Sequence, residues 1–139
     1  MEEFTMDFDI SELKNIISDP GRITSDIGEK YLTDSLGRLK GSASALVFPL
    51  STAETAAVMR FASENGIPVT PRGAGTNLVG STVPLKGGII LDFSRMNRIL
   101  ELDRETMTVT VEPGILLEDL QEFVGRNGLF YPPDPGEKA

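Results

Sequence analysis

Two short, almost wholly apolar runs constrain the fold of this chain more than any other feature. ALVF (45–48) ends at a proline, and GIILDF (88–93) comes after a further extended run, IPVTPR (67–72). Apolar runs of this length, bounded by proline and glycine, are typical of buried strands. Between ALVF and IPVTPR, the apolar residues of 52–65 have the spacing of a helix. We therefore expect a strand–helix–strand unit with a parallel pair of strands and a right-handed crossover.

The helix expected over 52–65 carries signals at both ends. Ser51 followed by Glu54 three residues later is the signature of a capping box, and Asn65-Gly66 is a typical C-terminal stop. The helical spacing points three apolar side chains inward: Val58, Phe61 and Ala62.

The flanking segments complete the predicted architecture. An earlier helix is expected within 9–19, capped by Asp9 or Ser11, with four aliphatic residues on one face: Ile10, Leu13, Ile16 and Ile17. Residues 22–44 read as largely irregular. Apolar and polar residues alternate over 99–103 and 108–112, which predicts a hairpin of two strands. The helical spacing of apolar residues over 115–127 predicts a second amphipathic helix. The predicted fold class is α+β with α/β character: a small, mostly parallel sheet with flanking helices plus a hairpin.

Composition excludes several kinds of function. The 139 residues suit one compact domain. The chain has no cysteine and no histidine, which excludes within it a disulfide, a Cys/His zinc site and a Ser-His triad. A net charge of −8 argues against nucleic acid or an anionic membrane as partner. No apolar run approaches the roughly 20 residues needed to span a bilayer, so we expect a soluble, cytoplasmic protein.

The stretch PRGAGTNLVGST (71–82) is the candidate ligand loop. Gly73 and Gly75 begin the dinucleotide pattern G-x-G-x-x-G, but Leu78 holds its last position and Pro84 prevents the helix that must follow. Gly75 to Gly80 has the spacing of a P-loop, but the lysine position is serine. Both familiar phosphate motifs therefore fail.

An anion-binding nest remains, in which successive amides of about residues 73–78 converge on an oxygen cluster. Gly73 and Gly75 permit positive φ and close approach. Arg72 would supply a local charge in an otherwise acidic protein, and three side chains would supply donors: Thr76, Asn77 and Ser81. The alternative is a surface turn without a ligand, and spacing alone does not decide between them.

Four stretches in order carry a family resemblance: PRGAGTNLVGST, GGIILDFSRMNRI, TVTVEPGILLEDLQEF and YPPDPGEKA. Together they resemble the FAD-binding domain of the vanillyl-alcohol oxidase and p-cresol methylhydroxylase (PCMH) type. More narrowly, they are similar to the glycolate oxidase flavoprotein subunit and to FAD-linked D-lactate and D-2-hydroxyacid dehydrogenases. The resemblance implies an N-terminal helix and irregular segment over 1–40. Residues 41–139 would form the first part of the FAD-binding domain, which stops before the rest of the flavin site and the substrate domain.

The resemblance also implies site residues. The loop would cradle the FAD pyrophosphate, and a proline near the end of the chain would lie beside the flavin; the implied residues are Pro71, Arg72, Gly73, Ala74, Gly75, Thr76, Asn77, Leu78, Gly80, Ser81 and Pro135. Residues 112–114 match a turn near the cofactor, although they fit a strand-terminating turn equally well. Some relatives attach FAD through a histidine in or near this loop. This chain has none, so non-covalent FAD is expected.

The function implied is oxidation of a 2-hydroxy acid, of glycolate or D-lactate type, by a longer parent enzyme with an electron-transfer partner subunit. No catalytic residue is nominated within these residues, and the chain alone is expected to be inactive. The alternative is a non-catalytic α/β module that binds another phosphate ligand, or a loop that binds none. Three carboxylates near strand ends (Asp92, Asp103 and Glu112) are expected to be solvated or capping, and Arg95 and Arg98 to lie at the surface.

Overall fold

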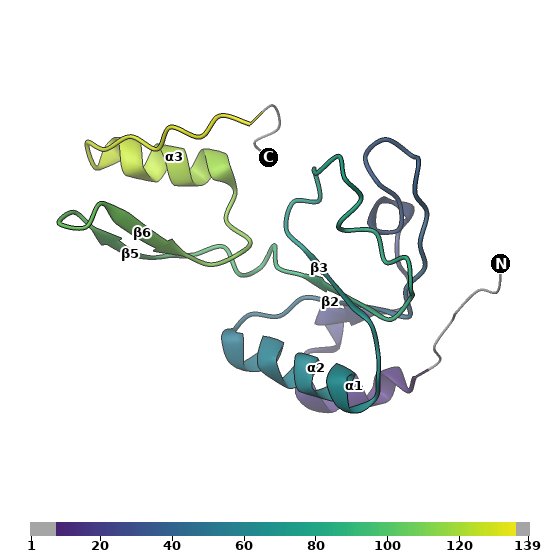
Figure 1. The fold of residues 1–139 in the computed structure, drawn as a ribbon. Coiled ribbons are helices and arrows are strands. Elements are labelled where there is room, and N and C mark those ends of the chain that lie inside the picture. The colour runs from purple at the N-terminus through teal and green to yellow at the C-terminus, as the bar shows by residue number, and fades with distance from the viewer. Residues whose placement is uncertain (1–7, 136–139) are drawn as a thin grey trace.

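The computed structural model describes residues 8–135 and shows two units side by side (Figure 1). The first is a four-stranded sheet with two helices, and the second is a hairpin with a third helix. The elements in chain order are α1 (Ile10–Ile16), η1 (Pro20–Arg22), β1 (Ile23–Thr24), η2 (Glu29–Tyr31), β2 (Ala45–Val47), α2 (Thr52–Glu64), β3 (Val69–Arg72), β4 (Ile89–Asp92), β5 (Ile99–Asp103), β6 (Thr108–Val111) and α3 (Leu117–Arg126). Over residues 8–135, no helix is long and apolar enough to cross a bilayer.

The sheet has the order β1-β2-β4-β3, and β2, β4 and β3 are parallel. The predicted fold class is confirmed. The expected parallel pair is wrong in one respect, because β2 and β3 do not pair with each other. Each pairs with β4, which lies between them. The antiparallel edge strand β1 falls in the segment expected to be irregular, since two residues are too few to show a pattern.

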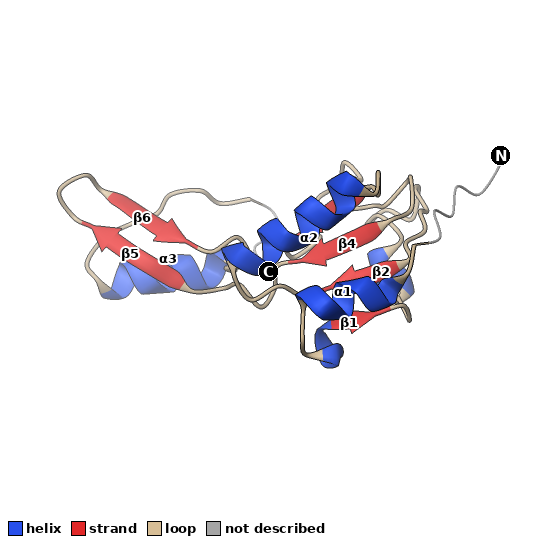
Figure 2. Ribbon diagram, turned by 90° about the horizontal axis from the view of Figure 1, so that it is seen from below, coloured by secondary structure: helices blue, strands red, loops and turns tan. Residues whose placement is uncertain are grey.

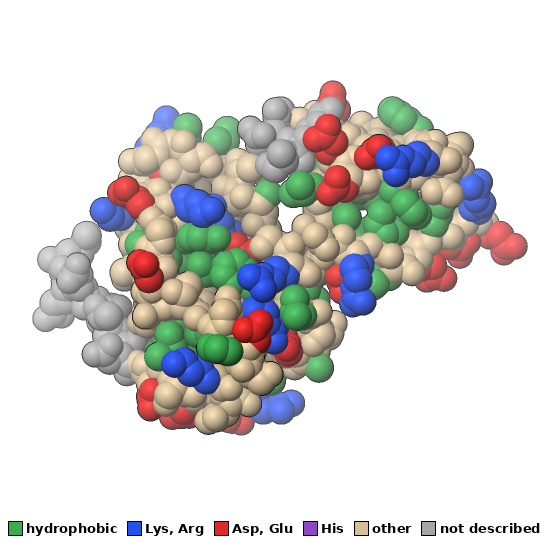
Figure 3. All heavy atoms as spheres, turned by 180° about the vertical axis from the view of Figure 1, so that it is seen from behind, with side chains coloured by type: hydrophobic (Ala, Val, Ile, Leu, Met, Phe, Trp, Pro, Cys, Tyr) green, Lys and Arg blue, Asp and Glu red, His purple; other side chains and the backbone are tan. Residues whose placement is uncertain are grey.

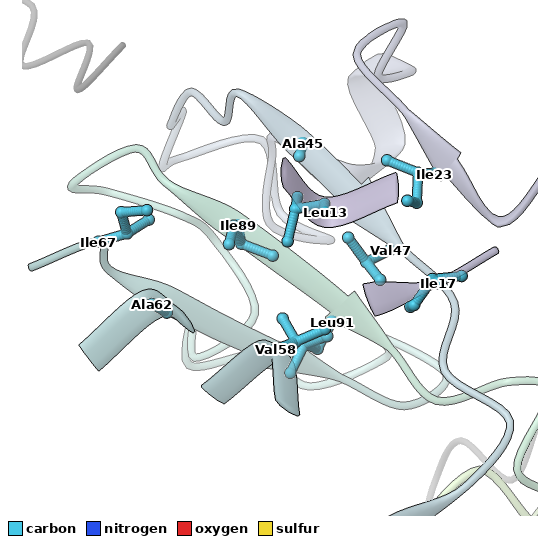
Figure 4. Packing of buried hydrophobic residues seen from close by; sticks show 10 residues of the cluster. All are labelled: Leu13, Ile17, Ile23, Ala45, Val47, Val58, Ala62, Ile67, Ile89 and Leu91. Atoms are coloured by element: carbon cyan, nitrogen blue, oxygen red, sulfur yellow. The ribbon is translucent and has the colours of Figure 1, made fainter. Parts of the chain in front are cut away.

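The core lies between one face of the sheet and the helices α1 and α2 (Figure 2). Alternate strand residues point to this face, and Figure 4 shows them meeting the helical side chains: Ala45, Val47, Ile89 and Leu91 from the strands, Leu13 and Ile17 from α1 and its end, and Val58 and Ala62 from α2. Ile10, Ile16 and Phe61 pack at the margin. The helical faces expected from the sequence are therefore confirmed.

The helix caps follow the sequence signals with one change. The Asp9 carboxylate accepts from the Ser11 amide at 2.8 Å, so Asp9 is the cap of α1. Ser51 Oγ accepts from the Glu54 amide at 3.1 Å, as a capping box requires. The Glu54 carboxylate, however, accepts from the Leu50 amide at 2.8 Å. It also accepts two hydrogen bonds from the guanidinium of Arg22, at 2.6 and 2.9 Å, which fastens η1 to the start of α2.

The second unit is joined to the first by a narrow connection, visible in Figure 3. It consists of the antiparallel hairpin β5–β6 and α3, whose Leu120 and Val124 are buried. Glu112, at the end of β6, is only 6% exposed. It accepts from the Arg98 amide at 2.8 Å and from the Arg98 guanidinium at 2.7 and 3.1 Å. Of the two alternatives expected for Glu112, the solvated one is wrong, because the carboxylate is buried and accepts from both the amide and the guanidinium of Arg98. The side chain of Arg98 is at the surface as expected.

Candidate functional site

The candidate loop leaves the carboxyl end of β3 and returns to the start of β4 on the sheet face opposite α1 and α2 (Figure 1). The segment that follows η2 lies beside it. The Ser42 amide donates to the Pro84 carbonyl at 3.1 Å, and Ser35 Oγ donates to the Gly75 carbonyl at 3.4 Å. Ligands of parallel α/β sheets bind at the carboxyl ends of the strands. The loop therefore lies where such a sheet offers a site.

The amides of residues 73–78 are available to a ligand. Within the described part of the chain, none of these six N–H groups donates to a protein acceptor. Those of Val79 and Ser81 differ, since both donate to Asn77 Oδ1, at 3.2 and 3.1 Å. Residues 73–88 contain no helix and no strand, which confirms that neither familiar phosphate motif is present. The amides required for an anion-binding nest are thus left unpaired by the fold itself.

The two glycines at the start of the loop have different roles. Gly75 has a φ of 76°, and a Cβ at this position would overlap the guanidinium of Arg72. The protein's own geometry therefore requires glycine here. Gly73 does not have positive φ, so the freedom that glycine permits is used at Gly75 and not at Gly73. The nearest atom to an added Cβ would be the Pro113 carbonyl oxygen at 3.8 Å, so the fold leaves space beside Gly73 that the described residues do not fill.

Arg72 lies beneath the loop rather than on the surface. Its side chain is on the same face as Asp92, its register partner on β4, and the residue is only 9% exposed. The guanidinium carbon lies 4.9 Å from the centre of the Tyr31 ring. Nη1 is buried and has no hydrogen-bond partner. An unpaired cationic donor next to Gly75, in a loop whose amides 73–78 have no protein acceptor, is suited to an anionic group, and the diphosphate of FAD is such a group.

The other predicted loop residues either shape the loop or point outward. Asn77 uses its carboxamide within the loop, because Nδ2 donates to Thr82 Oγ1 at 3.3 Å while Oδ1 accepts the two amides above. Gly80 packs against the side chain of Leu39. Among the predicted site residues of the loop, the exposed ones are Pro71, Gly73, Ala74, Thr76, Leu78 and Ser81.

Pro135 lies in the other unit. It ends an extended segment held along α3 by Gln121, whose Nε2 donates to the carbonyls of Tyr131 and Pro133 at 3.3 and 2.7 Å. The quoted motif ends in GEKA (136–139), which lies outside the described residues. The structure thus brings together the predicted residues from 71 to 81 and places Pro135 with α3.

Sequence analysis did not place two residues next to Arg72. Tyr31 lies in the segment expected to be irregular, and Asp92 is the register partner of Arg72. For Asp92, which was expected to be solvated or capping, the solvated alternative is wrong, because the residue is only 4% exposed. Burial is the main reason that the pKa of the Tyr31 hydroxyl is raised; Asp92 raises it further and Arg72 opposes the shift. The one available signal was register, because Arg72 and Asp92 both end parallel strands.

Comparison with known proteins identifies the family of the chain. The family described as FAD binding domain matches residues 43–139. The chain is 43% identical over 105 residues to glycolate oxidase subunit GlcD of Bacillus subtilis, which covers 76% of the chain and 22% of that protein. It is 41% identical over 130 residues to D-lactate dehydrogenase of Anaerostipes hadrus, which covers 93% of the chain and 27% of that protein. A crystal structure of p-cresol methylhydroxylase with substrate bound superposes with a TM-score of 0.72 at 25% identity, covering 86% of the chain and 24% of that structure.

The fold and the matched residues define the class: this is an FAD-binding module with the fold of the PCMH-type flavoproteins. The chain belongs to the FAD-binding domain family, and FAD is the cofactor of this domain. Among its relatives are proteins named as a glycolate oxidase subunit, a D-lactate dehydrogenase and a D-2-hydroxyglutarate dehydrogenase. The chain spans about a quarter of the length of the relatives described above.

Proposed function

We propose that this chain is the FAD-binding part of a flavin-dependent oxidoreductase that oxidises a 2-hydroxy acid of the glycolate or D-lactate type. The observation that carries the cofactor site is the set of amides 73–78 without a protein acceptor, in a loop whose Gly75 lies against the buried guanidinium of Arg72. The substrate class rests on the relatives, which are named as glycolate oxidase and D-lactate dehydrogenase.

In this proposal the loop residues bind the diphosphate of FAD and fix its position at the carboxyl ends of β3 and β4. The contacts would come from the amides of Gly73 to Leu78 and from Arg72, with Pro135 lying beside the flavin ring. FAD, when bound, supplies a two-electron acceptor. The chain contains no histidine, which supports a cofactor held without a covalent bond to these residues.

The groups that activate the substrate would lie outside these 139 residues, and electrons would leave through a partner subunit. The division at residue 41 belongs to the same proposal, with an N-terminal segment before it and the FAD-binding part after it. The cytoplasmic location expected from the sequence stays a prediction. The alternative of a module for another phosphate ligand is not favoured, since the family match is to an FAD-binding domain.

The test uses the full-length protein. We expect it to purify with bound flavin, visible by the absorbance of the oxidised form. Denaturation should release this flavin as unmodified FAD. Without oxygen, D-lactate or glycolate should bleach the flavin absorbance. Lactamide, which lacks the carboxylate, is the matched control and should leave the flavin oxidised. Failure to bind FAD would refute the cofactor site. Bound flavin that no 2-hydroxy acid bleaches would refute the substrate class while leaving the site intact.

A further inference from the structure

The support beneath the loop includes a residue that precedes the matched FAD-binding family. Tyr31 ends η2, whereas the family match begins at residue 43. Its ring nevertheless faces the guanidinium of Arg72 at 4.9 Å. Four residues later, Ser35 donates to the Gly75 carbonyl of the loop. The segment before the family match therefore contacts both the loop and the arginine at its base.

The position of Arg72 is unusual for a charged side chain. Arg72 is 9% exposed and Asp92 is 4% exposed. They are register partners on adjacent strands, yet the described residues include no ion pair between them. Asp92 Oδ1 instead accepts from the Ser94 amide at 2.8 Å. The face of the Tyr31 ring is thus the principal partner of a cation largely removed from water, an arrangement that makes a cation–π contact stronger.

The loop closes over this cation from above. Gly75 lies so close to the guanidinium that a side chain there would overlap it, and Nη1 is left buried without an acceptor. A buried donor without a partner is unfavourable, and a guanidinium donor more so than a neutral one. An anionic oxygen that enters among the loop amides would supply the missing acceptor.

We propose that Tyr31 is a positioning residue for the cofactor: its ring, with Asp92 alongside, holds the Arg72 guanidinium under the loop so that the unpaired Nη1 meets a diphosphate oxygen. This inference rests on the proposed function, because it takes FAD as the ligand of the loop. It adds that the N-terminal segment is part of the cofactor site, acting through Arg72 without itself touching FAD.

A double-mutant cycle in the full-length protein tests the proposal. The variants are Tyr31→Leu, Arg72→Met and the double variant, each freed of flavin and titrated with FAD and, separately, with ADP, which retains the diphosphate but lacks the flavin. We expect either single change to weaken binding of both ligands by about tenfold, which corresponds to the energy of a desolvated cation–π contact. The double variant should bind no more weakly than Arg72→Met alone, because Tyr31 acts only through Arg72.

Conservative and matched variants separate positioning from a general loss of structure. Tyr31→Phe keeps the ring and should bind FAD within about threefold of the unmodified protein. The pair Arg95 and Phe48 is a second cation–π contact, at 5.3 Å, that includes no residue of the loop, and Phe48→Leu should leave the affinity for ADP unchanged. The melting temperature of each flavin-free variant shows whether it folds.

The outcomes are distinct. Additive losses from Tyr31→Leu and Arg72→Met, or a Tyr31→Phe variant as weak as Tyr31→Leu, would overturn the positioning role. Unchanged binding in a folded Tyr31→Leu variant would do the same while leaving the FAD site in place. If the unmodified protein bound neither FAD nor ADP, the proposed function itself would fail.

Discussion

Substitution of the two loop glycines by alanine separates what the fold requires from what the ligand requires. Gly75 has a φ of 76°, and a Cβ there would overlap the Arg72 guanidinium. Gly73 has neither constraint, since the nearest atom to its added Cβ would be 3.8 Å away. The two positions lie two residues apart in the same loop, so each serves as the control for the other.

The expected magnitudes follow from these geometries. In Gly75→Ala, the left-handed backbone costs about 1–2 kcal/mol. Displacing Arg72 from the Tyr31 ring costs about 0.5–2 kcal/mol more. We therefore expect the free energy of unfolding to fall by about 1.5–4 kcal/mol. In Gly73→Ala, the loss of backbone freedom in the unfolded chain offsets other changes, and the free energy of unfolding should stay within about 0.5 kcal/mol of its original value.

Affinity for FAD should give a different pattern. Both substitutions should weaken binding by at least about tenfold: Gly75→Ala because the loop and Arg72 are rearranged, and Gly73→Ala because the methyl group occupies space that the diphosphate needs. Stability is measured by urea unfolding without flavin, and affinity by quenching of flavin fluorescence. A Gly73→Ala variant that keeps both its stability and its affinity would refute close approach of the ligand to Gly73. A Gly75→Ala variant as stable as the original would refute the loop geometry.

Three further predictions concern the rest of the chain. Arg22→Met should lower the free energy of unfolding by about 3 kcal/mol in urea, because the half-buried Glu54 loses its bidentate partner; Arg126→Met, which removes only an exposed pair, should cost less than about 0.5 kcal/mol. The Arg22 guanidinium lowers the pKa of Glu54 and that of Arg98 lowers the pKa of Glu112. The two ion pairs therefore stabilise the fold at pH values above 4.5, the ordinary pKa of glutamate, and this stabilisation is lost as the pH falls through the lowered pKa values. The melting temperature should drop on acidification below pH 4.5. An unchanged melting temperature would contradict both ion pairs. Finally, the 139-residue chain alone should not retain stoichiometric FAD through gel filtration, because three or four loop hydrogen bonds supply about 5–10 kcal/mol against an association cost of about 4–15 kcal/mol.

Local sequence patterns predicted most of the fold. Helical spacing gave the buried faces around Leu13 and Val58, and short apolar runs gave β2 and β4. The pairing of the strands was not available from local pattern, because nothing in ALVF or IPVTPR states that a later strand will lie between them. The two-residue strand β1 was missed for a related reason, since its partner on β2 lies more than twenty residues away.

For the candidate site, the sequence predicted the backbone conformation of the loop but not the side-chain contacts that support it. The glycine spacing correctly indicated a loop without helix, and positive φ at Gly75. Charged contacts such as Arg22 with Glu54, or Arg72 with Tyr31, join residues more than thirty positions apart. Such contacts depend on how the elements pack, and no periodicity in the sequence records them. The roles of individual loop residues toward FAD stay predictions.

The central place of β4 has a consequence for how the chain folds as it is made. Both of its neighbours in the sheet, β2 and β3, are synthesised first. Strand β2 can already pair with β1, but neither β2 nor β3 can pair with β4 until Asp92 has left the ribosome. Until then two apolar segments have unpaired edges, a condition that favours aggregation or capture by chaperones. Arrival of the last parallel strand would complete the sheet in a single step, so the nascent chain should gain resistance to protease abruptly rather than strand by strand.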